Sequence, residues 1–138
     1  MNTKLYIKIF LFTIFLFSFS KFSFSQDEFE MKFGDTTVTM KKYVFGIYKR
    51  GPNKDMDSVQ LSILQAAHME HLTELSKSGK LCIAGPLDGD NEIRGLLIFN
   101  LKDLKEAEKY CMEDPAVKAG RLTYELYYWW AAKGSTLK

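Results

Sequence analysis

The order of strand-like and helix-like segments most constrains what this chain can fold into. Aromatic and β-branched residues dominate the strand-like segments, whereas the helix-like segments repeat apolar residues at helical spacing. In chain order the segments are a strand at 41–50, a helix at 58–78, strands at 80–87 and 93–101, a helix at 104–113 and a strand at 121–131. Turn-forming residues separate them, such as Gly51 and Pro52 after the first strand. The sequence therefore predicts the order β-α-β-β-α-β.

Two β-α-β halves with right-handed crossovers pair their strands into a four-stranded antiparallel sheet with both helices on one face. This arrangement is the ferredoxin-like fold of the α+β class. Residues 26–40, ahead of the first strand, are polar and weakly patterned, so we expect a flexible lead-in, with a short extra strand as the alternative. Residues 41–138 have the length of one compact domain and are too few for two ordinary ones.

The first helix carries a histidine on its apolar side. Its leucines lie within about 80° of one another when the helix is viewed down its axis; they are Leu61, Leu64, Leu72 and Leu75. His68 falls inside the same arc, so its titratable imidazole points toward the core or toward a cavity beside the core. Two interpretations stay open: a core histidine bonded to a backbone carbonyl, or a residue of a functional site.

Asp114 is the second candidate residue. Asp114 followed by Pro115 is typical of an N-cap and the first residue of a helix, and Gly120 would close such a short turn. A half-buried histidine and a distant aspartate are also common components of active sites. Because both predicted helices pack on the same face of the sheet, we expect His68 and Asp114 to converge at the mouth of a cavity.

Other chemistry receives less support. His68 and His71 share a helix face and such pairs can bind metal, yet no third or fourth ligand stands at a suitable spacing, so we predict no metal. His71 lies at the edge of the leucine arc, where a rim or hydrogen-bonding role is expected. The chain has no phosphate-binding loop or nucleophile motif, and we predict no cofactor. Cys82 and Cys111 either form a disulfide, if they are adjacent, or pack as small hydrophobic residues.

The last strand predicts an association surface. Tyr127 and Trp129 alternate with Tyr128 and Trp130, so either phase of the strand points one tyrosine and one tryptophan away from the helices. Two helices cannot cover both faces of the sheet, which leaves an aromatic face uncovered. Two such sheets packed face to face would form a homodimer, a dimeric α+β barrel.

Residues 1–25 have the three parts of a secretory signal peptide. Lys4 and Lys8 flank an apolar run that is too short to cross a bilayer comfortably, and Ser23 and Ser25 precede a cut before Gln26. We therefore expect export to the periplasm or the extracellular space, and no membrane attachment after cleavage. An uncleaved N-terminal anchor is the alternative.

Removing this segment changes the charge of the protein. Three of the 19 basic residues lie in residues 1–25 and none of the 17 acidic residues does, so the remainder carries about one net negative charge. No basic excess is left to favour nucleic acid or anionic lipid, and we expect neither as a partner. A small-molecule ligand or substrate is the expected partner.

In combination these motifs resemble the YciI-like (YCII-related) proteins of the dimeric α+β barrel superfamily. The resemblance covers residues 43–133 and is carried by HMEHLTELSKSGKLCIAGPL, IRGLLIF and DPAVKAGRLTYELYYWW. It implies ferredoxin-like domains that dimerise through their sheets. It also implies that His68 and Asp114 are a catalytic pair, because they take the places of the histidine and aspartate that the family shares. His71 matches a more variable position and receives no catalytic role.

Two functions remain open at this stage. One is a cofactor-independent enzyme in which His68 transfers a proton and Asp114 orients the imidazole. The superfamily contains lactone isomerases and dehydrochlorinases, so the resemblance implies elimination or isomerisation of a small cyclic substrate. The other is a non-catalytic protein that binds a small ligand or serves as an accessory, in which the same pair would fix the shape of a pocket.

Overall fold

The computed structural model describes residues 27–137, and its elements follow the predicted order with one strand and one short helix added. They are β1 (Glu28–Phe33), β2 (Thr36–Arg50), α2 (Ser58–Lys77), β3 (Leu81–Pro86), β4 (Ile93–Phe99), α3 (Leu104–Glu113), α4 (Pro115–Lys118) and β5 (Leu122–Ala132). The α+β, ferredoxin-like prediction is confirmed. The predicted signal peptide at residues 1–25 lies outside the described residues.

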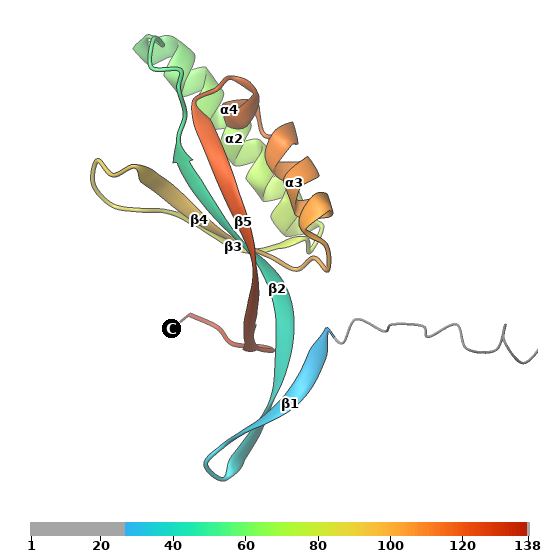
Figure 1. Ribbon diagram of the computed structural model, residues 1–138. Helices are drawn as coiled ribbons and strands as arrows, with labels where there is room; N and C mark the ends of the chain where they lie inside the picture. The colour runs from blue at the N-terminus through green and yellow to red at the C-terminus, as the bar shows by residue number, and fades with distance from the viewer. Residues whose placement is uncertain (1–26, 138) are drawn as a thin grey trace, which may run out of the picture.

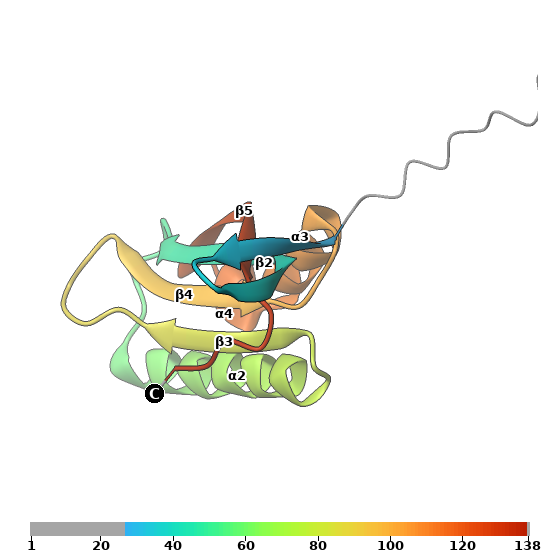
Figure 2. The same cartoon turned by 90° about the horizontal axis from the view of Figure 1, so that it is seen from below.

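The sheet has the strand order that two interleaved β-α-β units produce. β2 pairs with both β5 and β4, and β4 pairs with β3, always antiparallel, so the central part of the sheet runs β5-β2-β4-β3. The helices α2, α3 and α4 lie on one side of the sheet (Figure 1). Seen from below, α2 runs along β3, the strand at one edge of the sheet (Figure 2). None of the helices within residues 27–137 has the length and apolarity needed to span a membrane.

For residues 26–40 the alternative of a short extra strand applies in place of the flexible lead-in, because Glu28–Phe33 form β1 and residues 36–40 form the beginning of β2. The two strands make an antiparallel hairpin that extends beyond the helices (Figure 1). Phe29 packs edge-on against Trp130 of β5, with ring centroids 4.9 Å apart. Lys133 forms an ion pair with Glu28 at 3.0 Å. These partners lie about one hundred residues away in the sequence, so the local pattern could not reveal that the segment is ordered.

The core lies between the sheet and the helices. It includes Val44, Tyr48, Leu72, Leu75, Leu81, Leu97, Phe99, Leu101, Ala107 and Cys111. The predicted apolar side of α2 is confirmed for its second half, where His68, Leu72 and Leu75 are buried. Leu61 and Leu64, nearer the start of the helix, are only half-buried because this part of α2 faces a cavity instead of the core.

The two cysteines are free and differ in their surroundings. Cys111 is fully buried in α3 and packs as a small hydrophobic residue. Cys82 is exposed, because it sits where the register between β3 and β4 shifts after Leu81.

The face of the sheet opposite the helices is uncovered in the single chain and largely apolar, with the Lys49–Glu125 ion pair near one end. Tyr128 pairs with Val44, which is buried under the helices, so Tyr128 points to the helix side of the sheet. Tyr127 and Trp129 alternate with it along β5 and therefore lie on the open face. Tyr128 and Trp130 lie on the helix side, yet all four side chains are between 37% and 49% exposed. The helices do not reach this end of β5, so the alternation exposes aromatic rings on both of its faces.

Candidate functional site

Asp114 lies at the junction of α3 and α4 and has no exposed surface. Its Oδ1 accepts a hydrogen bond from the backbone N–H of Ala116 at 2.8 Å, which caps α4. Its Oδ2 accepts a hydrogen bond from the hydroxyl of Tyr48, on β2, at 2.7 Å. The buried carboxylate is therefore satisfied by donors from two separate elements of the fold.

His68 reaches the same carboxylate from α2. Its Nδ1 lies 2.8 Å from Oδ2 and 3.0 Å from Oδ1 of Asp114. An ionised carboxylate can only accept hydrogen bonds, so Nδ1 of His68 carries a hydrogen that it donates to Asp114. The expected convergence of His68 and Asp114 is confirmed. Both interpretations of Asp114 apply at once, because it caps a helix and binds the histidine.

The second ring nitrogen of His68, Nε2, is the one that faces the cavity. His68 lines this cavity and its side chain keeps 11% of its exposure. Within residues 27–137, every buried side-chain nitrogen or oxygen has a hydrogen-bond partner. Nε2 of His68 has no hydrogen-bond partner in this part of the chain, so Nε2 is not buried. The alternative of a core histidine bonded to a backbone carbonyl does not apply, because the partner is a carboxylate. A ligand in the cavity can therefore reach Nε2.

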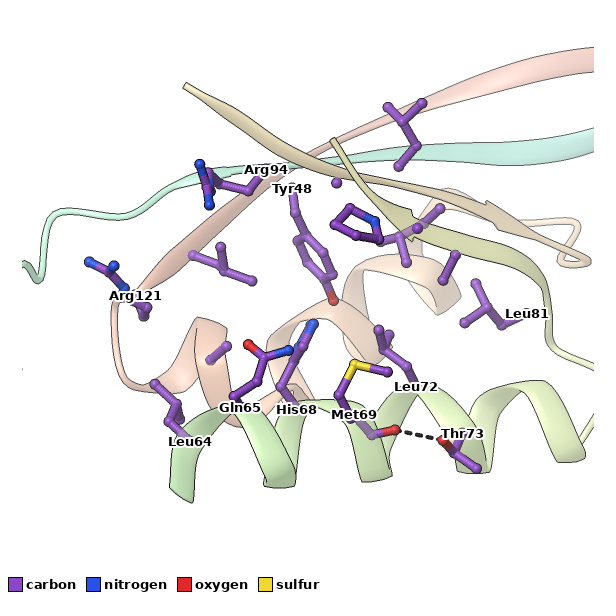
Figure 3. A pocket seen from close by; sticks show the side chains of 18 of the residues that line it. Tyr48, Leu64, Gln65, His68, Met69, Leu72, Thr73, Leu81, Arg94 and Arg121 are labelled. Atoms are coloured by element: carbon purple, nitrogen blue, oxygen red, sulfur yellow. Dashed lines mark hydrogen bonds between the residues drawn. The ribbon is translucent and has the colours of Figure 1, made fainter. Parts of the chain in front are cut away.

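Tyr48 is the residue of this site that the sequence did not single out. Its ring stands edge-on to the imidazole of His68, with ring centroids 5.7 Å apart, and its hydroxyl end points toward His68 (Figure 3). The side chain is 3% exposed. In the sequence Tyr48 alternates in phase with Val44, which indicates a buried position, but nothing local distinguishes a core tyrosine from one that holds a carboxylate.

Burial and hydrogen bonding set the charges of the group. Burial by itself would raise the pKa of Asp114, but the hydrogen bonds from His68 and Tyr48 outweigh it and hold the pKa below its ordinary value. Burial, together with Cys111 and Asp114, raises the pKa of Tyr48 far above its ordinary value, so its hydroxyl stays a donor. Burial also raises the pKa of the Cys111 thiol to about 12, which leaves it neutral and unreactive. Asp114 therefore holds a negative charge against the imidazole of His68.

A cavity of about 810 Å³ opens beside His68, between α2 and the strands β3 and β4. Gln65, Met69 and Leu72 project from α2 into it (Figure 3). Its remaining walls come mainly from β3, β4 and the ends of β2 and β5. This volume is large enough for a ring-sized organic molecule.

His71 does not belong to this site. It is absent from the lining of the cavity, and its Nε2 donates a hydrogen bond to the backbone carbonyl of Tyr110 at 2.9 Å, which ties α2 to α3. This agrees with the hydrogen-bonding role expected for it. Within residues 27–137 no three residues among histidine, cysteine, aspartate and glutamate gather as a metal site would require.

A comparison with models of protein families shows which family the chain matches. The family model described as the YCII-related domain matches residues 42–130. The chain belongs to the YCII-related domain family. The matched range begins within β2, so β1 and the part of β2 before Lys42 lie outside the YCII-related match. The resemblance recognised in the sequence motifs is thereby confirmed.

Among solved structures, this YCII-related chain is similar to a 5-chloro-2-hydroxyhydroquinone dehydrochlorinase from Burkholderia phenoliruptrix AC1100 in complex with 2,5-dihydroxybenzoquinone. The two chains are 25% identical, with a TM-score of 0.48, and the aligned part covers 62% of this chain and 92% of that one. The comparison with curated proteins found no significant match.

Proposed function

We propose that this YCII-related protein is a cofactor-independent enzyme in which His68 transfers a proton to and from a small molecule bound in the cavity. One observation carries the proposal: the Nδ1 side of the imidazole is held by the buried Asp114 carboxylate, while Nε2 faces a ring-sized cavity. A general base must have its lone pair directed at the substrate and its other nitrogen held in place. His68 meets both conditions.

The arrangement fits proton abstraction from carbon. Nε2 would take a proton from the substrate, and the electron pair of the broken C–H bond would form a double bond. In an elimination that pair expels a leaving group from the neighbouring carbon, whereas in an isomerisation the proton returns from Nε2 to a different carbon. The imidazolium that forms in between would be stabilised by the negative charge of Asp114, 2.8 Å from Nδ1. A small cyclic substrate suits the size of the cavity.

A homodimer is part of this proposal. The open face of the sheet presents a continuous set of partly exposed apolar side chains: Tyr43, Phe45, Ile47, Ile83, Leu96, Ile98, Tyr127 and Trp129. Two faces of this kind pack about 10 Å apart in sheet-on-sheet interfaces. Pairing through this face would leave the cavity, on the helix side, open to solvent.

The proposal also places the reaction outside the cytoplasm. It rests on the signal-peptide pattern of residues 1–25. A periplasmic or extracellular enzyme would meet its substrate as it enters or leaves the cell.

Hydrogen exchange tests the base directly, because it detects cleavage of a C–H bond whether or not the rest of the reaction follows. The protein is incubated in D₂O with a panel of lactones, enolisable cyclic ketones and halogenated hydroquinones, and deuterium incorporation at carbon is followed by NMR. We expect exchange or turnover with at least one class, slower by about 100-fold or more in His68→Asn. His71→Asn is the matched control, because it removes an imidazole from the same helix but outside the cavity.

The competing function is a non-catalytic ligand-binding protein. It would be favoured if compounds bind in the cavity and shift the signals of His68, yet none undergoes exchange or turnover above the rate of the His68→Asn variant.

A further inference from the structure

The cavity beside His68 has a strongly asymmetric charge. Three arginines line it, namely Arg50, Arg94 and Arg121, whereas no aspartate or glutamate does within the described part of the chain. Arg94 and Arg121 both lie toward the end of the cavity marked by Leu64 and Gln65, away from Thr73 and Leu81 (Figure 3). One end of the cavity therefore carries a positive charge and the rest is mostly apolar.

The topology of the sheet explains why the arginines meet. Arg50 ends β2 and pairs with Leu122, the residue that follows Arg121. The backbone N–H of Arg50 donates to the carbonyl of Glu92, two residues before Arg94. The backbone segments that carry the three arginines thus adjoin one another at the same end of the sheet, although they are far apart in the sequence.

The backbone beneath Arg121 is tightly held. Gly51 donates to the carbonyl of Arg121 at 2.8 Å, and the N–H of Arg121 donates to the carbonyl of Ala116 at 2.9 Å. A side chain at Gly51 would bring its Cβ to 2.1 Å from the carbonyl oxygen of Gly120, so only glycine lets the two segments approach this closely. Arg121 therefore extends from a rigid support.

The arginines have more donors than the protein uses. Arg50 and Arg94 both pair with Asp90, whose side chain is 88% exposed on a loop. Arg121 makes one long hydrogen bond, 3.4 Å to the carbonyl of Asn53, and no carboxylate within residues 27–137 lies in ion-pair distance of it. Each guanidinium has five N–H donors arranged to hold a planar oxyanion. Arg94 also donates to the backbone carbonyls of Gly89 and Asn91, at 3.3 and 3.4 Å. These contacts and the shared carboxylate leave most of the N–H donors, and about two positive charges, available to a ligand.

We propose that Arg50, Arg94 and Arg121 form an anion-binding wall, so that the protein takes a small organic anion bearing a carboxylate or phenolate oxygen. This inference rests on the proposed function for the position of the reacting carbon. The anionic group binds Arg121 and its neighbours, and the apolar body of the molecule extends along α2 past Gln65 to Nε2 of His68. Arg121 determines the specificity for charge, while His68 performs the chemistry.

Matched pairs of compounds separate charge from shape. The probes are 4-hydroxybenzoate with 4-hydroxybenzamide, and cyclohexanecarboxylate with cyclohexanecarboxamide, titrated into the protein while the arginine Nε–Hε signals are followed by NMR. We expect each acid to shift the Arg121 signal and to bind about tenfold or more tightly than its amide. Arg121→Gln should weaken binding of the acids to the level of the amides. Lys118→Gln, which removes the same charge from an exposed position outside the cavity, should change nothing.

The inference is overturned if amides bind as well as acids, if no acid perturbs Arg121, or if Lys118→Gln weakens binding as much as Arg121→Gln. Repeating the titration in His68→Asn separates this inference from the proposed function. Acids that still bind there, when the unaltered protein turns over nothing, would leave the anion-binding wall intact and refute the enzyme. Turnover of neutral compounds without binding of the acids would support the enzyme and refute the anion-binding wall.

Discussion

Asp114→Asn is the substitution that best separates a buried functional pair from a simple helix cap. Asparagine is as good an N-cap as aspartate, so a residue that only caps α4 should tolerate the change. In the structure, however, the carboxylate of Asp114 accepts from Ala116, Tyr48 and His68. The lowered pKa of Asp114 means that the fold stabilises its ionised form in spite of burial. An uncharged amide forfeits this stabilisation.

The magnitude follows from the three donors. A hydrogen bond to a charged partner contributes about 1.5–3 kcal/mol, compared with about 1 kcal/mol for a neutral pair. Losing the charge on an acceptor that serves three donors should therefore lower the free energy of unfolding by about 3 kcal/mol. The amide NH₂ of the new asparagine would also face the donor groups of Tyr48 and His68. The imidazole could accept a hydrogen bond from this NH₂ only if its own hydrogen moved from Nδ1 to Nε2, and Nε2 could then no longer act as the base.

Asp103→Asn is the matched control, because Asp103 caps α3 in the same way, through Lys105 N–H at 2.9 Å, but is exposed. Urea unfolding at pH 7 and a fixed protein concentration gives both values. We expect a change of about 3 kcal/mol for Asp114→Asn and less than about 0.5 kcal/mol for Asp103→Asn. Equal, small changes in the two variants would refute the reasoning and reduce Asp114 to a cap.

Three further predictions concern the dimer, the pH response and the amino terminus. Trp129→Glu should convert dimers to monomers in light scattering while Trp130→Glu, on the helix side, leaves them intact; an unmodified protein that is already monomeric at high concentration would refute the interface. The pKa of Asp114 is lower in the folded than in the unfolded protein. The difference in unfolding free energy between the unaltered protein and Asp114→Asn should therefore be largest at neutral pH, and it should vanish as the pH falls through the folded pKa, below about pH 4. A loss independent of pH would contradict this origin. Mass spectrometry of the protein from its native host should find Gln26 at the amino terminus, and an intact Met1 would disprove cleavage.

The periodicities of the sequence predict most of the fold. Strand and helix patterns specify the order of the elements, and the leucine spacing in α2 places His68 on the buried side. The convergence of His68 and Asp114 follows from the topology, since both helices pack on the same face. These features depend on local patterns combined with a chirality rule, which a single sequence provides.

The remainder depends on contacts between distant residues. The hairpin at residues 28–40 is ordered by Trp130 and Lys133, which local patterning cannot indicate. Tyr48 acquires its role only because Asp114 lies over it, and Arg121 joins the cavity only because β5 starts beside the end of β2. Contacts of this kind bring side chains into the site but leave no trace in the alternation of apolar and polar residues along the strand.

The tautomer of the His68 ring is the most direct test of the central claim. A long-range ¹H–¹⁵N correlation spectrum distinguishes the two nitrogens of each imidazole, and the chain contains only two histidines. We predict that the neutral His68 ring carries its hydrogen on Nδ1, toward Asp114, and that the Nε2 signal moves when an organic acid enters the cavity. A hydrogen on Nε2, or an Nε2 signal that no cavity ligand affects, would contradict the assignment of His68 as the base.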